Sequence, residues 1–250
     1  MRPARLSETG DPVLLVAHGS RDPRAAAATR ALAAAVAAAR PGRRVVPSWL
    51  DHTRPGPTEA LRELADAGFP RVVLVPLLLT AAYHRRVDIP MAVAAVRQTV
   101  PELAVRVTDV LGPAVRGVDP ALLAGLRRRL AEAEPGGYDG LVLAAAGTRD
   151  PAARASVGRV AASLRAALAV PTRVSYASAA PPATGVAVTR LRVRGARRVA
   201  VAAYFLAPGL FHDVATASAR QAGAVAVAAP LSDAPELVDL VLRRVDAVFG

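Results

Sequence analysis

The sequence predicts an α/β fold made of two tandem, duplicated domains, each with helices on both faces of a four-stranded parallel sheet. Apolar runs of strand length alternate with longer helix-like segments along the whole chain. This alternation is typical of parallel sheets built from crossover units. In addition, one short motif occurs twice, as Gly-Ser-Arg-Asp-Pro at residues 19–23 and as Gly-Thr-Arg-Asp-Pro at residues 147–151. We therefore expect one three-layer αβα domain for each copy.

The first copy of the motif connects an apolar run to an alanine-rich segment. The run Val13–Ala17 has the length of a buried parallel strand. Gly19 permits a sharp turn, Asp22 can cap the following helix, and Pro23 suits its first turn. His18 then lies at the carboxyl end of the strand, which is where open parallel sheets bind their ligands.

The other elements follow from the same reading of apolar periodicity and helix end signals. Further strands are expected at residues 43–50, 71–79, 103–107, 141–145, 173–178, 198–206 and 224–228. Helices are expected at about residues 22–40, 59–67, 88–100, 119–134, 151–168, 184–194 and 235–248. A further helix is expected to end at about residue 221. Each half of the chain thus has four strands.

A distant histidine supports the duplication. His84 and His212 are offset by the same number of residues as His18 and Ala146, the positions that precede the two motif copies. A coincidence of the five-residue motif with a histidine at equal distance is improbable, so we infer a repeat of a whole domain.

The best domain boundary is the tripeptide Pro135-Gly136-Gly137. We therefore expect an N-terminal domain at residues 1–136, which carries the active site, and a C-terminal domain at residues 137–250, whose site is degenerate.

Composition excludes several classes of protein. The chain has no cysteine, so it has neither disulfides nor thiolate metal sites, and any metal must bind to His, Asp or Glu. No apolar stretch approaches the ~20 residues of a membrane-spanning helix. The polar start of the sequence lacks an apolar signal core, so we expect a cytoplasmic protein.

The basic charge is a weaker indication. The formal net charge is +12, and every basic side chain except histidine is arginine. Such a charge can attract nucleic acid. However, the arginines are scattered, and only four Phe and four Tyr residues could stack on bases. We therefore expect no nucleic-acid partner.

Three polar residues are expected at one edge of the first sheet. His18 and His84 each follow an apolar strand, and Asp51 ends the strand between them. Two imidazoles and a carboxylate can hold a divalent transition metal, or an imidazole can act as a base. His52, the fourth histidine, reads as a surface residue.

Other catalytic motifs are absent. No Gly-x-Gly-x-x-Gly follows the first strand, and no Walker-type Gly-Lys-Ser/Thr occurs, since there is no lysine. The triplet His18-Gly19-Ser20 is not a serine-nucleophile elbow, because Gly-x-Ser-x-Gly is missing.

Five segments follow one another along the chain: Ala17-His18-Gly19-Ser20-Arg21, Trp49-Leu50-Asp51, Val75-Pro76-Leu77-Leu78-Leu79, Tyr83-His84 and Asp88-Ile89-Pro90. In this order they resemble the motifs of the sirohydrochlorin chelatases, whose long members are tandem duplications of one chelatase-like domain. The resemblance extends over nearly the whole chain and implies ATP-independent insertion of Fe²⁺ or Co²⁺ into a carboxylate-rich tetrapyrrole. The metal would be a substrate, with no permanent cofactor and no partner chain, so a monomer is expected.

By motif position, the resemblance makes His18 and His84 the catalytic residues and His18, Asp51 and His84 the metal ligands. Asp51 stands where the family usually has glutamate. The residues assigned to the tetrapyrrole are Gly19, Ser20, Arg21, Tyr83 and His212, and Arg85 and Arg86 are further candidates for its carboxylates.

In the second half, Ala146 replaces the first histidine and residues 177–179 replace the acidic turn. The resemblance therefore implies one site, in the N-terminal half, facing the C-terminal half across a cleft. The alternative is a protein that binds a metal or tetrapyrrole without turnover. The choice between iron and cobalt stays open, with iron preferred.

Overall fold

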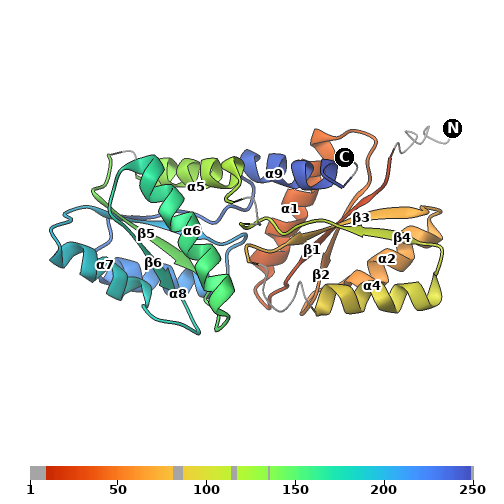
Figure 1. The fold of residues 1–250 in the computed structure, drawn as a ribbon, viewed down its shortest axis with the longest axis horizontal. Coiled ribbons are helices and arrows are strands. Elements are labelled where there is room, and N and C mark those ends of the chain that lie inside the picture. The colour runs from red at the N-terminus through yellow and green to blue at the C-terminus, as the bar shows by residue number, and fades with distance from the viewer. Residues whose placement is uncertain (1–9, 81–86, 114–116, 135, 249–250) are drawn as a thin grey trace. The chain divides into compact units, whose positions relative to one another are not determined.

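The computed structural model describes residues 10–80, 87–113, 117–134 and 136–248. Contacts divide the chain into two compact units, and each contains a four-stranded parallel sheet with helices between the strands (Figure 1). The predicted α/β class with tandem domains is therefore confirmed. Among the described residues, no helix combines the length and the apolar character needed to cross a bilayer.

The first sheet has the order β2-β1-β3-β4. Its strands are β1 (Val13–Ala17), β2 (Val45–Trp49), β3 (Arg71–Leu77) and β4 (Ala104–Val107). The helices between them are α1 (Pro23–Ala39), α2 (Pro57–Asp66) and α4 (Asp88–Thr99). Strand β3 is shorter than predicted by two residues. Helix α2 begins two residues earlier than predicted, because Gly56 is its N-cap and Pro57 fits the first turn.

The core of the first unit follows from strand alternation. Leu14 and Val16 of β1 and Leu74 of β3 share one face of the sheet, where they join buried residues of α2 and α4 in one cluster. Their neighbours along the strands, Leu15 and Val75, are also fully buried. Both faces of the sheet are therefore covered, as the predicted three-layer arrangement requires.

The second sheet repeats this topology as β6-β5-β7-β8. Its strands are β5 (Gly140–Ala145), β6 (Thr172–Tyr176), β7 (Val199–Tyr204) and β8 (Ala226–Val227). Its helices are α5 (Pro120–Ala133), α6 (Pro151–Leu168), α7 (Thr184–Val193) and α8 (Leu210–Gln221). Alternate residues of β5 and β7 again form a cluster with α7 and α8.

The compact units differ from the sequence repeats at two helices. The first unit contains the residues up to Leu111 together with those from Val238 onward, and the second runs from Gly112 to Leu237. Helix α5, which the predicted boundary assigned to the first domain, packs on β7 of the second unit. Most of the last helix, α9 (Pro235–Asp246), belongs to the first unit.

Polar contacts within the first unit hold the end of the chain in place. Arg40 forms an ion pair of 2.6 Å with Asp246, and Arg244 donates a hydrogen bond of 3.0 Å to the carbonyl of Val110. The tripeptide at residues 135–137 therefore separates the repeats in sequence, whereas packing places the last helix with the first sheet.

Two glycine substitutions, one in the repeated turn and one in a helix, test whether the fold requires the turn. Gly147 has φ +103°, and a Cβ there would lie less than 3.0 Å from the carbonyl oxygen of Ser178. We expect Gly147→Ala to lower the free energy of unfolding by more than about 2 kcal/mol, measured by urea denaturation. The matched control is Gly158→Ala in α6, where a Cβ meets no atom within 4 Å. The control should raise stability by about 0.5–1 kcal/mol. Equal effects of the two substitutions would contradict this account of the turn.

Candidate functional site

Parallel pairing brings three strand ends together at the carboxyl edge of the first sheet. Ala17, the last residue of β1, pairs with Trp49 on one side and with Leu77 on the other. The segments that follow these three residues therefore begin beside one another. These are the segments in which the sequence placed His18, Asp51 and His84.

The structure places His18 and Asp51 in adjacent turns. The backbone N–H of Asp51 donates to the carbonyl of His18 at 3.0 Å, and the N–H of Leu50 donates to the carbonyl of Ala17 at 3.0 Å. The side chains of His18 and Asp51 are both exposed. An imidazole and a carboxylate are thus presented to solvent from one short stretch of the sheet edge.

Gly19 explains how the two turns can lie so close. It has φ +96°, and a Cβ at this position would lie less than 3.0 Å from the carbonyl oxygen of Asp51. Only glycine allows this approach without a shift of the backbone. The residue predicted to bind substrate therefore has a demonstrable role in positioning His18 and Asp51.

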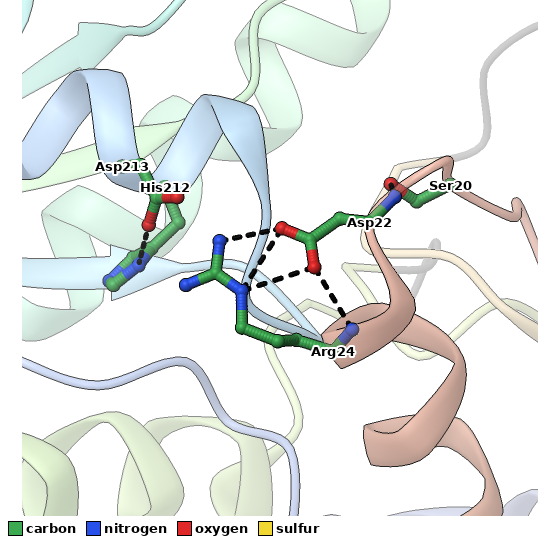
Figure 2. Close-up of polar contacts among 5 residues, drawn as sticks. All are labelled: Ser20, Asp22, Arg24, His212 and Asp213. Carbon is green, nitrogen blue, oxygen red and sulfur yellow. Dashed lines mark hydrogen bonds and ion pairs between the residues drawn. The ribbon is translucent and has the colours of Figure 1, made fainter.

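Ser20 and Asp22 form the turn that leads into α1 (Figure 2). The Ser20 Oγ accepts a hydrogen bond of 3.1 Å from the N–H of Asp22. Asp22 accepts from the N–H of Arg24 at 2.9 Å as the N-cap of α1, and its carboxylate also pairs with the guanidinium of Arg24. The hydrogen bonds from the Arg24 side chain hold the pKa of Asp22 below its ordinary value. Arg21, in contrast, is exposed.

Four of the residues named from the sequence lie outside the described part of the chain. Tyr83 and His84 fall in the gap between residues 80 and 87, as do Arg85 and Arg86. Within the described ranges, no group of three His, Asp or Glu side chains is arranged to hold a metal ion. The ligand set His18, Asp51 and His84 thus remains a prediction from the sequence.

Trp49 was not among the predicted site residues, although it stands directly beside Ala17 in the sheet. It is buried, and the guanidinium of Arg30 lies over its ring at 5.0 Å from the centroid. This cation–π contact ties α1 to the end of β2 and so supports the turn at Asp51. Two sequence signals pointed to it: it is the single tryptophan of the chain, and it belongs to the segment Trp49-Leu50-Asp51 that carries the family resemblance.

The second unit reproduces the turn without the imidazole and the carboxylate. The N–H of Ser178 donates to the carbonyl of Ala146 at 2.9 Å, which matches the bond between Asp51 and His18. Gly147 repeats the close approach of Gly19. The imidazole and the carboxylate are absent at the equivalent positions, as the sequence predicted.

His212 is engaged in contacts within the second unit. Its Nε2 lies 3.2 Å from the carbonyl of Ala228, and its ring meets Phe205 edge to face, with centroids 5.6 Å apart. The Nδ1 lies 3.8 Å from a carboxylate oxygen of Asp213 (Figure 2). A carbonyl only accepts, so Nε2 carries the proton in this bond and does not present a lone pair to a metal. The contacts give His212 a structural role, and substrate binding by its side chain, 15% exposed, stays a prediction.

The fold and its repeated turn define a tandem duplication of one α/β domain. A family model described as CbiX matches residues 12–133 and, a second time, residues 140–248. The chain belongs to the CbiX family, and its two halves are copies of the family's domain. The resemblance to the sirohydrochlorin chelatases is thereby confirmed at the level of the family.

Solved structures show the same fold. SirB from Bacillus subtilis with Fe³⁺ has a TM-score of 0.81 and 20% sequence identity, and the alignment covers 95% of both chains. The sirohydrochlorin chelatase SirB from Bacillus subtilis subspecies spizizenii, in complex with cobalt, has a TM-score of 0.79 and 19% identity over 95% of this chain and 94% of that one.

CbiX, described as the terminal enzyme for biosynthesis of siroheme in denitrifying bacteria, has a TM-score of 0.64 and 22% identity over 96% of this chain and all of that one. No curated protein sequence matches the chain. At these identities, the solved structures establish the architecture of the chain.

The contacts of His212 generate a prediction. We expect His212→Ala to lower the free energy of unfolding by about 1–3 kcal/mol, because the edge contact with Phe205 is lost and the carbonyl of Ala228 loses a donor. Thermal and urea denaturation would measure this. His52→Asn is the control, since His52 is exposed and has φ 63°, a conformation that asparagine tolerates. A His212 variant as stable as the wild type would contradict the structural role.

Proposed function

We propose that this protein inserts a divalent metal into sirohydrochlorin, an anionic tetrapyrrole, without ATP. Membership in the CbiX family carries this proposal. It is supported by the names of two relatives with the same fold, a sirohydrochlorin chelatase in complex with cobalt and an enzyme of siroheme biosynthesis. The chain has no lysine, and hence no Walker-type phosphate loop, which agrees with a reaction that uses no nucleotide.

His18 is the proposed base. Metal insertion must remove two protons from pyrrole nitrogens, and a neutral imidazole can accept a proton near neutral pH. The exposed position of His18 at the carboxyl edge of the sheet gives a substrate access to its ring. His84 is proposed as the second catalytic histidine because of its position in the motif. This part of the proposal rests on the sequence alone.

Asp51 is proposed to help deliver the metal. Its turn is fixed to that of His18 by the bond between the Asp51 N–H and the His18 carbonyl. A site of imidazole and carboxylate groups binds Fe²⁺ or Co²⁺ through N and O atoms. Ligands of this kind can exchange, so the ion can pass to the macrocycle, which binds it more strongly.

The second unit argues for one metal site per chain. Ala146 and Ser178 occupy the positions of His18 and Asp51, and neither an alanine nor a hydrogen-bonded serine replaces those ligands. The chemistry is therefore assigned to the first unit. Imidazole and carboxylate ligands suit both ions, so these residues do not separate them; iron is proposed as the preferred substrate and cobalt as the alternative.

The insertion assay is the primary test. Purified protein, metal-free sirohydrochlorin and Fe²⁺ or Co²⁺ are mixed under anaerobic conditions, and the absorbance change of the macrocycle is followed. We expect a rate above that of the spontaneous reaction, with Fe²⁺ preferred. Tight stoichiometric binding of the tetrapyrrole, with metal insertion no faster than the spontaneous reaction, would instead identify a carrier protein and would refute the enzymatic function.

A substitution at His18 tests the assignment of the site. His18→Ala should lower kcat by at least about 100-fold, the usual contribution of a positioned general base, while the fold stays intact because His18 lies in a turn outside the core. His52→Asn is the matched control, since it also removes an exposed imidazole near this edge of the sheet. Equal losses in the two variants would contradict a specific role for His18.

A further inference from the structure

An open cavity lies at the amino-terminal edge of the second sheet, opposite the edge that carries the repeated turn. Its volume is about 610 Å³, and all of its lining residues belong to the second unit. The wall includes Asp139, which precedes β5, Thr172, which begins β6, and Ala196, which precedes β7. A space of this size is within the range of sites that bind small molecules.

Three arginines from three different elements line this cavity. Arg165 comes from the last turn of α6, Arg173 from β6, and Arg194 is the C-cap of α7. None of the three side chains forms a hydrogen bond or an ion pair with any residue in the described part of the chain. The cavity therefore gathers three guanidinium groups that the fold itself does not pair.

The one acid in the wall, Asp139, is engaged by the backbone. One of its carboxylate oxygens accepts from the N–H of Arg197 at 2.9 Å, and the other accepts from the N–H of Arg198 at 2.7 Å. These bonds hold the pKa of Asp139 below its ordinary value. Asp139 thus joins the starts of β5 and β7, and the positive charge of the cavity wall exceeds the negative charge.

The ends of α6 and α7 explain only part of this charge. A helix C-terminus favours cations, and Arg165 and Arg194 lie at such ends. Arg173, however, belongs to a strand. In the first unit, the equivalent helices α1 and α2 have no basic residue in their last turns. The fold therefore does not require arginines at this edge.

The first unit fills the equivalent place with an aromatic ring. The N–H of Phe69 donates to the carbonyl of Leu64 at 3.2 Å, as the N–H of Ala196 does to that of Leu191 at 3.1 Å, so Phe69 and Ala196 are equivalent. Phe69 packs against the core of the first unit, and the guanidinium of Arg44 lies over its ring at 5.9 Å from the centroid. In the second unit, the small side chain of Ala196 leaves this space open.

The arginines of the cavity also differ from their counterparts in the first unit. Val46 stands at the register position of Arg173, and Ala67 is the C-cap of α2 where Arg194 is the C-cap of α7. One copy of the domain thus has apolar side chains and a ring at this edge. The other has guanidinium groups and an open space, and both differences favour an anionic ligand.

We propose that this cavity binds a small phosphate-bearing anion. The parallel N–H groups of a guanidinium match pairs of phosphate oxygens. A phosphate offers three terminal oxygens and can therefore contact guanidinium groups from several elements at once, whereas a carboxylate offers two. Pro171 and Ala196 give the wall an apolar part for the remainder of the ligand. The inference is independent of the proposed metal chemistry, because it uses residues of the second unit alone.

Titration calorimetry of pyrophosphate into the full chain at low ionic strength tests the role of the arginines. The proteins compared are the wild type, Arg173→Gln, Arg194→Gln and the control Arg190→Gln. Arg190 is exposed in the last turn of α7 and is not a lining residue, so its substitution removes the same charge from the same region. We expect one pyrophosphate per chain and a Kd at least about fivefold higher in Arg173→Gln and Arg194→Gln. The control should bind as the wild type does.

The substitution Ala196→Phe tests the space without a change of charge. It introduces the ring that the first unit carries at Phe69, and it should raise the Kd for pyrophosphate at least about fivefold. Melting temperatures without ligand check that each variant is folded. If Ala196→Phe is not folded, the comparison of Arg194→Gln with Arg190→Gln decides the matter.

Citrate supplies the comparison with a carboxylate ligand, and we expect it to bind more weakly than pyrophosphate. Tighter binding of citrate would overturn the assignment to phosphate. Equal affinities of Arg194→Gln and Arg190→Gln for pyrophosphate would show a general attraction to a basic chain and would overturn the inference. Metal insertion by Arg194→Gln should equal that of the wild type, so the outcome of this experiment and that of the insertion assay are separate.

Discussion

The close approach of two turns is the constraint on which the candidate site depends. Gly19 places the turn after β1 against the carbonyl of Asp51, and the N–H of Asp51 bonds back to the carbonyl of His18. A larger residue at position 19 would force these segments apart. The parallel register beneath, with Ala17 between Trp49 and Leu77, sets the positions from which the turns depart. The backbones of His18 and Asp51 are therefore neighbours, and both side chains start from the same stretch of the sheet edge.

The duplication shows which parts of this arrangement are structural. The second unit keeps the sheet order, the glycine contact and the helix cap, although its imidazole and carboxylate are gone. A turn that persists without its reactive groups is required by the fold itself. His18 and Asp51 are exposed, and the second unit keeps its sheet and its turn with Ala146 and Ser178 at these positions. The architecture of the turn therefore does not require the two proposed ligands.

Charge gives the two units a common feature beyond the fold. The chain carries a formal net charge of +12, entirely from arginine, and an anionic, carboxylate-rich substrate would meet a favourable field. Most of these arginines are scattered, and some form ion pairs within the chain, as Arg40 does with Asp246. Arg21 and Arg149 differ from them because they occur at equivalent places in both units beside a turn of known geometry.

The sequence alone determined the strands, the helices, the duplication and the edge at which His18 and Asp51 meet. These features depend on local periodicity, on turn residues and on the rule that parallel strands end at one edge. Only the tertiary structure showed that the missing side chain of Gly19 lets two turns approach each other. It also showed that His212 contacts Phe205 and the carbonyl of Ala228. It also assigned α5 to the second unit and most of α9 to the first. A helix buries its apolar face against whichever sheet lies within reach, and reach is a property of the folded chain that position in the sequence does not encode.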